Sequence, residues 1–283
     1  GGGAGSGGRF LMSPELRLRV ISGVILGVLV LAATWAGGIW FRSLAVLIMV
    51  LVHYEFSTIT KSPERAPLAN AMGWMAILAT GAFVLASLPS MAVAAILIGA
   101  GGAVLAGRRR GGGRWSAVAV LYAGFSGLAL AEIRGEGHLG LFAMLFLFAV
   151  VWATDILAYF CGRAIGGPKL APRISPGKTW SGAIFGALAG VGAGVAVALI
   201  VRQGGGLLVP FIALVLAVSS EIGDLFESWV KRRFGAKDSS RLIPGHGGVM
   251  DRVDGLVFAA FAAFLLGNVL PLADHAAMAD ELA

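Results

Sequence analysis

The sequence predicts an all-α, polytopic integral membrane protein with about nine transmembrane helices and a cytoplasmic N-terminus. Of its 283 residues, 58% are hydrophobic and only 13% are charged. A single soluble core cannot bury so much apolar surface, so many side chains must face lipid. The apolar residues also come in runs of about 20, the length that crosses a bilayer as a helix. Lysine and arginine are concentrated in alternate connections between these runs.

Nine apolar runs are long enough to be predicted as spans. They cover residues 20–36, 38–56, 68–88, 90–107, 115–131, 139–160, 180–201, 207–230 and 254–272. The fourth run is rich in glycine and follows closely on the third, from which Pro89 separates it. If this run did not cross the membrane, every later span would have the opposite orientation.

The distribution of lysine and arginine predicts the orientation, because basic connections are retained on the cytoplasmic side. With the N-terminus inside and nine crossings, the inner segments hold eighteen of these residues, and the outer ones hold only Arg42, Arg134 and Arg202. The net charge of +7 is therefore first a signal of topology, and it also suits an anionic partner. The sequence lacks a platform of alternating basic and aromatic residues, so no nucleic acid is expected as a partner.

Carboxylates gather where three of the predicted spans meet the cytoplasmic interface. Asp155 lies near the inner end of the sixth run, Glu221 and Asp224 near that of the eighth, and Asp251 and Asp254 at the start of the last. Ionisable groups at the border of a span are costly and usually face a cavity or a partner. Together with many nearby cations and glycines, they predict a site for a hard divalent cation and a phosphate-bearing substrate.

Simple charge pairing is the alternative interpretation of these acids. Asp224 is seven residues before Lys231, and Asp251 follows a basic loop, so each carboxylate could lock two helices together. This interpretation explains one acid as well as a metal site does, but it does not explain why several acids cluster.

Two polar connections are candidates for phosphate binding. The stretch Pro244-Gly245-His246-Gly247-Gly248 could bring backbone N–H groups to an anion at the start of a helix near Met250, or it could be a flexible turn.

The second connection holds Ser175, Lys178 and Thr179, where hydroxyls and a cation could bind phosphate at a helix start. Alternatively, these residues form an ordinary N-cap with Trp180 at the interface. The sequence Gly177-Lys178-Thr179 is not a nucleotide-binding P-loop, because Pro172 stands where that motif needs glycine.

The second half of the chain holds a set of mostly polar residues and glycines at characteristic spacings. It consists of Ser228, Lys231, Arg232, Lys237, Asp238, His246, Gly247, Gly248, Asp251, Arg252 and Asp254. These residues fill every fixed position in the signature of the phosphatidate cytidylyltransferases, or CDP-diacylglycerol synthases, and the chain resembles that family. The segments from Thr154 to Arg163 and from Ser175 to Thr179 are also similar to the family, whereas the spans before residue 139 match it only in being hydrophobic.

The resemblance implies an enzyme that transfers the cytidylyl group of CTP to phosphatidic acid, giving CDP-diacylglycerol and pyrophosphate. The lipid phosphate would attack the α-phosphorus, with Mg²⁺ held in an expected two-ion site. Asp224 and Asp251 are the implied metal ligands, with Asp155 and Asp254 as further candidates, and Lys231 completes the implied catalytic set. The implied substrate-binding residues are Ser175, Lys178, Thr179, Ser228, Arg232, Lys237, His246, Gly247, Gly248 and Arg252. His246 could instead brace the glycine turn.

These observations also predict the organisation and the location of the protein. Residues 1–11 have the composition of a linker before a native start at Met12, residues 12–138 form N-terminal transmembrane helices, and residues 139–283 form a C-terminal transmembrane catalytic region. The expected location is a bacterial inner membrane, with the active site facing the cytoplasm and membrane lipid around the protein. A homodimer would suit the family resemblance.

Three rival functions are considered, of which a purely structural membrane scaffold leaves the polar cluster unexplained. A membrane transporter for an anionic substrate would carry its acids near the bilayer midplane, whereas these acids cluster at one interface. A CDP-alcohol phosphotransferase would need a further motif after Asp254-Gly255, and Leu256 breaks that pattern.

Overall fold

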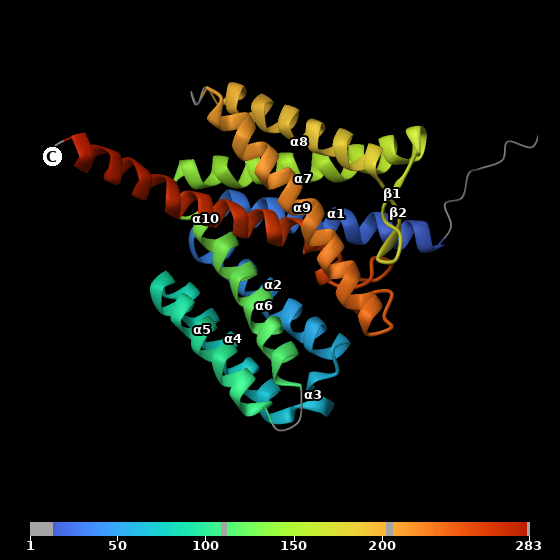
Figure 1. The fold of residues 1–283 in the computed structure, drawn as a ribbon, viewed down its shortest axis with the longest axis vertical. Coiled ribbons are helices and arrows are strands. Elements are labelled where there is room, and N and C mark those ends of the chain that lie inside the picture. Colours follow the sequence, from blue (N-terminus) through green and yellow to red (C-terminus); the bar gives the residue numbers. More distant parts are fainter. Residues whose placement is uncertain (1–13, 109–111, 202–205, 282–283) are drawn as a thin grey trace, which may run out of the picture.

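The computed structural model describes residues 14–108, 112–201 and 206–281, and it is helical apart from one small hairpin (Figure 1). The helices are α1 (Pro14–Ala36), α2 (Gly38–Ile59), α3 (Ser62–Arg65), α4 (Pro67–Leu85), α5 (Pro89–Ala106), α6 (Gly113–Arg134), α7 (His138–Ile165), α8 (Trp180–Ile200), α9 (Leu208–Arg233) and α10 (Met250–Glu281). The strands β1 (Lys169–Ala171) and β2 (Ser175–Thr179) pair antiparallel between α7 and α8. Each of the predicted apolar runs is a helix, whereas the hairpin was not predicted.

Some sequence-based expectations concern residues outside this described part. They are the linker 1–11, the start at Met12, and Arg109, Arg110 and Arg202 in the charge count.

Seven described helices, α2 and α4 to α9, are long and apolar enough to cross a membrane, and the apolar part of α1, Val20–Ala36, is shorter. Large apolar side chains lie exposed along them, including Ile98, Leu139 and Leu199. In lipid, such side chains are solvated while each helix satisfies its own backbone hydrogen bonds. The fold is therefore that of a polytopic membrane protein.

Proline and glycine set several helix boundaries. Pro67 and Pro89 occupy the first positions of α4 and α5, where the missing N–H costs no hydrogen bond. Gly135 and Gly166 follow α6 and α7 with positive φ angles of 46° and 68°, a conformation that glycine adopts without strain.

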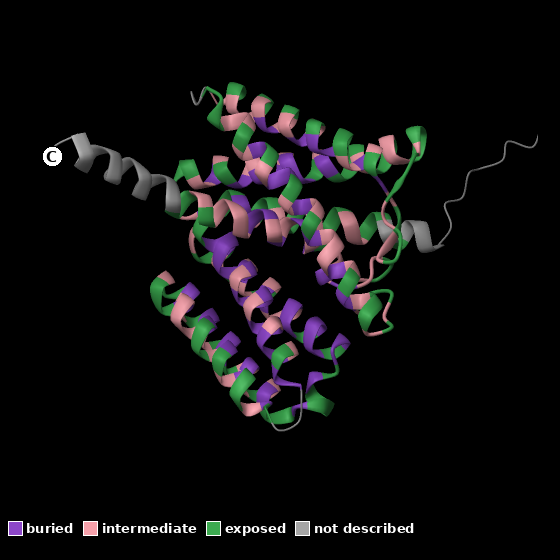
Figure 2. Cartoon of the chain, in the orientation of Figure 1, coloured by how far each residue is buried: buried purple, intermediate pink, exposed green. Residues whose placement is uncertain are grey.

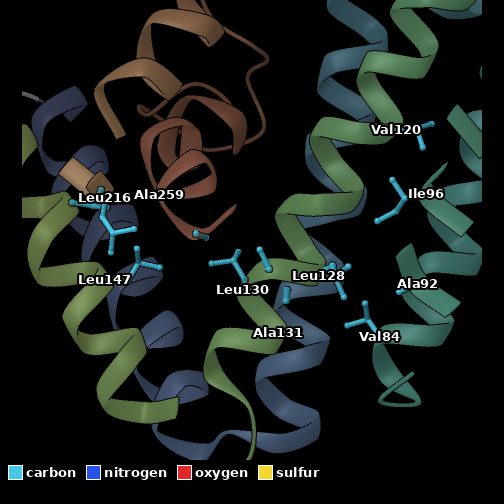
Figure 3. Packing of buried hydrophobic residues seen from close by; sticks show 14 of the residues in the cluster. Val84, Ala92, Ile96, Val120, Leu128, Leu130, Ala131, Leu147, Leu216 and Ala259 are labelled. Atoms are coloured by element: carbon cyan, nitrogen blue, oxygen red, sulfur yellow. The ribbon is translucent and has the colours of Figure 1, made fainter. Parts of the chain in front are cut away.

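Helix α6 forms the centre of the protein. It is buried along most of its length and contacts α2, α4, α5, α7 and α10, whereas only a small share of the residues of α5 and α8 is buried (Figure 2). Figure 3 shows Leu128 and Leu130 of α6 between Ile96 of α5 on one side and Leu147 of α7 and Leu216 of α9 on the other. The core thus joins the first six helices to the last four.

The α7–α8 contact is unusually close because glycines line it. Gly182, Gly186 and Gly190 recur every four residues on α8, so they share one face. A Cβ atom on Gly186 would lie 2.8 Å from the Thr154 carbonyl oxygen, and one on Gly190 would overlap the Thr154 hydroxyl. Small residues of this kind let membrane helices approach backbone to backbone. The contact also brings the start of α8 beside Asp155 on α7.

Three polar connections of the chain gather at one end of the bundle. The turn between α3 and α4 touches the loop after α5 at Ala66 and Gly112. Trp115, at the start of α6, meets Phe234, just after α9, with ring centroids 4.9 Å apart. Arg42, near the start of α2, and Arg134, at the end of α6, lie at the other end of the bundle from these connections. There Arg134 Nε donates to the carbonyl of Thr34 at 2.5 Å. The helices α2, α4, α5 and α6 therefore run in alternate directions between the two ends.

Candidate active site

A cavity of about 720 Å³ opens between α7, α8, α9 and the β-hairpin. Its wall includes Asp155 of α7, Glu221 and Asp224 of α9, and Lys178 and Thr179 at the end of the hairpin. The volume falls in the range of about 300–1,000 Å³ typical of small-molecule sites. Acids from two of the three helices predicted to carry them thus face one space.

Lys178 and Asp224 form the central ion pair of this cavity. Lys178 Nζ donates to Asp224 Oδ2 at 2.6 Å, and the two side chains are 30% and 22% exposed. The antiparallel pairing of Lys169 with Thr179 and a 3.0 Å hydrogen bond from Trp180 N–H to the Pro168 carbonyl hold Lys178 in place. Asp224 therefore pairs with Lys178 and not with Lys231, the partner suggested by the i, i+7 spacing.

Thr179 has two roles in the structure, because it caps α8 and also lines the cavity. Its Oγ1 accepts a hydrogen bond from the Gly182 N–H at 3.1 Å, as an N-cap residue does. Ser175, four residues earlier on the hairpin, lines the cavity too. The N-cap interpretation of this segment is thus correct, and its polar groups nevertheless border the cavity.

Lys231 links α9 to α10 beside the cavity. Its Nζ lies 2.6 Å from Glu227 Oε2 and 2.6 Å from Asp251 Oδ1. The three side chains are only 12%, 1% and 6% exposed, so this is a buried cation between two carboxylates. Removing one partner from such a cluster leaves an uncompensated buried charge.

Asp251 uses its other oxygen to hold the loop after α9. Oδ2 accepts hydrogen bonds from the backbone N–H and the hydroxyl of Ser239 and from the Gly248 N–H, each at 2.9 Å. Burial by itself raises the pKa of the Asp251 carboxyl, but the hydrogen bonds from Lys231 and from the Gly248 N–H outweigh it and lower the pKa to about 2. Asp251 does not line the 720 Å³ cavity.

Glu55 of α2 is the other carboxylate that holds this loop. It is fully buried and accepts hydrogen bonds from the hydroxyls of Ser239 and Ser240 at 2.9 and 2.6 Å, and from the N–H groups of Val249 and Met250 at 2.9 and 2.7 Å. The last two N–H groups belong to the N-terminus of α10, which favours a negative charge. The anion at this helix start is therefore a side chain of the protein itself.

The glycine turn that was predicted to cradle phosphate is tied to these two carboxylates. The Gly248 N–H donates to Asp251, and a Cβ atom on Gly248 would lie 2.5 Å from Glu55 Oε1, so only glycine permits the contact. His246 Nδ1 lies 2.8 Å from the Ser22 hydroxyl of α1. In this conformation His246 braces the turn against α1.

The remaining predicted residues lie around the same end of the protein. Arg232, Lys237 and Arg252 are exposed, and Ser228 is half-buried on α9. Asp254 lies beside Asp224 where α9 and α10 pack together.

The carboxylates of the cavity fit a magnesium ion that is shared with a substrate. Mg²⁺ is usually held by one or two carboxylates and completes its ligands with water and phosphate oxygens. Asp155 and Asp224 face the same cavity and offer such oxygens. Within residues 14–108, 112–201 and 206–281, no group of three or more His, Cys, Asp or Glu side chains is arranged to hold a metal. The donor set therefore suits a substrate-linked ion better than a closed structural site.

Comparison with known proteins assigns the chain to a family. A profile of the Cytidylyltransferase family matches residues 17–270. The chain belongs to the cytidylyltransferase family. This confirms the predicted family and the prediction that the protein is a nucleotidyltransferase. The match begins in α1, although the motifs seen in the sequence lie only in the second half.

Individual relatives within the cytidylyltransferase family agree with this assignment. A phosphatidate cytidylyltransferase of Brucella abortus (strain 9-941) is 46% identical over 255 residues, which cover 90% of this chain and 94% of the relative. The enzyme of that name from Haemophilus influenzae is 45% identical over 145 residues, 48% of this chain and 49% of its own. The one from Pseudomonas aeruginosa is 40% identical over 170 residues, 54% of this chain and 59% of its own.

In this member of the cytidylyltransferase family, two features were missed from the sequence. One is the hairpin that carries Lys178, whose strands are too short to give a periodic pattern. The other is Glu55, which was counted only as part of the second apolar run. A carboxylate within a predicted span is itself a functional signal, and it could have directed attention to α2.

Proposed function

We propose that the protein transfers the cytidylyl group of CTP to phosphatidic acid, giving CDP-diacylglycerol and pyrophosphate. The supporting observation is the 720 Å³ cavity in which Asp155, Asp224 and Lys178 meet, in a chain whose relatives are named phosphatidate cytidylyltransferases. No observation favours the rival transporter for an anionic substrate.

The reaction needs positioning and charge compensation more than a protein nucleophile. An oxygen of the lipid phosphate forms a bond to the α-phosphorus of CTP, and the bond from that phosphorus to the bridging oxygen of the β-phosphate breaks. Pyrophosphate leaves with the bonding electron pair. Bringing two polyanions together and offsetting the charge on the leaving group are the main tasks of the site.

Side chains of the cavity can perform these tasks. Lys178 and Arg163 border the cavity and would donate to phosphate oxygens, and the Ser175 hydroxyl lies on the same wall. Asp224 orients the Lys178 ammonium through their 2.6 Å contact. Asp224 and Asp155 would hold Mg²⁺, which when bound would offset the charge on phosphate oxygens. A second ion remains a prediction.

Asp251 and Lys231 would act mainly by holding the elements around the site in place. Asp251 accepts hydrogen bonds from the loop, and Lys231 joins it to α9. A role for Asp251 as a metal ligand would require it to exchange these partners for the ion. We therefore propose that the pair fixes the junction of α9 and α10, with exposed Arg232, Lys237 and Arg252 available to the triphosphate nearby.

The same reasoning extends to topology. The polar connections that carry the predicted inner basic residues lie at one end of the bundle, which supports nine crossings, a cytoplasmic N-terminus and a cytoplasmic active site. CTP would arrive from the cytoplasm and the lipid from the bilayer of a bacterial inner membrane. A homodimer is proposed on the family resemblance alone.

A labelling experiment tests the reaction. The purified full-length chain is incubated in detergent with phosphatidic acid, Mg²⁺ and CTP labelled either in the cytosine or in the γ-phosphate, and the lipid is extracted. We expect the cytosine label to enter the lipid phase and the γ-phosphate label to stay in water as pyrophosphate. Cytosine label that stays aqueous, or transfer that needs no phosphatidic acid, would refute the proposal.

A further inference from the structure

A second cavity lies apart from the active site, at the end of α9. It has a volume of about 400 Å³ and is lined by Lys61, Arg65, Trp115, Arg233 and Phe234. These residues come from the turn before α3, from α3, from the start of α6 and from the end of α9. It shares no lining residue with the larger cavity.

Three cations face this second cavity without a compensating acid. Within the part of the chain that the structure describes, no carboxylate lies within ion-pair distance of Lys61, Arg65 or Arg233. All three side chains are exposed. Like charges gathered in this way repel one another, and an anion bound among them would relieve that repulsion.

Aromatic rings hold the two arginines in place. The Arg65 guanidinium lies 5.5 Å from the centre of the Phe234 ring, and that of Arg233 lies 5.6 Å from Trp115 and 5.9 Å from Trp229. Trp115 packs edge-on against Phe234 at 4.9 Å. Cation–π contact orients a guanidinium while leaving N–H groups free to donate. The cations are therefore pre-positioned for a ligand with several acceptor oxygens.

The place of this pocket in the fold indicates the source of its anion. Lys61, Arg65 and Phe234 lie just beyond the ends of the long apolar helices α2 and α9, and Trp115 lies at the start of α6. Basic residues together with tryptophan at the ends of membrane helices lie at the depth of the phospholipid head groups. A lipid phosphate is always present at that depth.

We propose that this pocket binds the phosphate group of an anionic membrane phospholipid. The arginine forks would donate to its oxygens, as they do to phosphate in other proteins. Because α9 continues without interruption from Asp224 to Arg233, about 14 Å at 1.5 Å per residue, the head group would also hold the last turns of the helix that carries the active-site carboxylate. The inference does not depend on the proposed reaction.

Lipid binding to the purified, delipidated full chain tests the proposal directly. Native mass spectrometry in detergent would measure the affinities for phosphatidylglycerol and for phosphatidylcholine with the same acyl chains. The double variant Arg65→Gln/Arg233→Gln should weaken phosphatidylglycerol binding at least about tenfold, since each basic side chain contributes about 1 kcal/mol near an anionic surface. Phosphatidylcholine binding should change little.

Arg108→Gln is the matched control, because Arg108 is exposed at the same end of the protein and does not line the pocket. It should bind phosphatidylglycerol like the unchanged protein. If the double variant fails to fold, Lys61→Gln alone should weaken binding about fivefold. Equal binding of the two lipids, or equal loss in the control, would overturn the proposal. Displacement of the lipid by millimolar inorganic phosphate would also overturn it and assign the pocket to a soluble phosphate.

Discussion

Lys178 and Asp224 stand 46 residues apart in the chain, and their side chains meet at 2.6 Å in the wall of the larger cavity. One comes from a hairpin of irregular register and the other from a long apolar helix. The cavity is therefore closed by a hairpin that connects α7 to α8 and is bonded to α9 through this ion pair, and the position of the hairpin decides where the Lys178 charge lies.

Lys178→Met should remove most of the activity while leaving the fold intact. The ammonium is the cation nearest Asp224, and loss of one such charge-stabilising donor costs about 10²-fold in turnover. Steady-state rates with CTP and phosphatidic acid check this. Arg173→Gln, in the exposed turn of the same hairpin and outside the cavity lining, is the control and should stay within about threefold of the unchanged enzyme, since exposed charges contribute little.

Asp224→Asn and Asp251→Asn should have different signatures. Asp224→Asn should abolish most Mg²⁺-dependent transfer with little change in thermal unfolding, because its side chain faces the cavity. Asp251→Asn should lower the free energy of unfolding by about 3 kcal/mol, because buried Lys231 loses a partner.

Activity titrated against Mg²⁺ and thermal unfolding in detergent separate these two roles. An Asp251→Asn protein that unfolds at the normal temperature but no longer responds to Mg²⁺ would show that Asp251 is a metal ligand and not a brace.

Glu55→Gln should loosen the loop between α9 and α10. The amide can accept at only one of its two terminal atoms, so at least one of the donors from Ser239, Ser240 and the α10 N-terminus loses its partner. We expect a loss of about 2 kcal/mol in stability, since a buried donor without a partner costs about 1–3 kcal/mol, and faster tryptic cleavage after Arg241. Glu64→Gln, exposed on α3, should change neither measurement.

Gly190→Ala should lower stability, and Gly192→Ala should not. A Cβ on Gly190 would overlap Thr154 of α7, whereas one on Gly192 would meet nothing within 4 Å. The first should destabilise by about 1–3 kcal/mol through overpacking, and the second should be neutral or stabilising by up to about 1 kcal/mol, because alanine favours helices over glycine. Thermal unfolding of the two variants in one detergent checks the signs, and a loss of stability in Gly192→Ala would contradict the packing described.

The helices were predictable because length and hydropathy alone determine a span. The fourth apolar run was in question for its glycines, yet it forms α5 between Pro89 and Ala106. Ends were less accurate: α7 continues to Ile165 and α9 to Arg233, because interfacial polar residues extend a helix beyond its apolar stretch. The hairpin was not predicted because strands of three and five residues are too short to show an alternation of apolar and polar residues.

The sequence predicted which residues belong to the site, but it predicted only partly which of them pair with one another. The family resemblance implied Asp224, Lys178 and Asp251 as functional residues, but sequence distance could not show that Asp224 would meet Lys178 and that Asp251 would meet Lys231. Those choices depend on how α8, α9 and α10 pack, and this is determined by contacts such as the α8 glycines that lie far from the motif.

The hydrogen bonds that Glu55 of α2 accepts from the start of α10 limit how chimeras of these enzymes can be built. A chimera that kept residues 139–283 and borrowed its earlier helices from a distant relative would carry every signature residue. It would still leave the N-terminus of α10 without its anion unless the donor supplied an acid at the matching place on its second helix. The helices before residue 139 therefore cannot be exchanged freely between relatives.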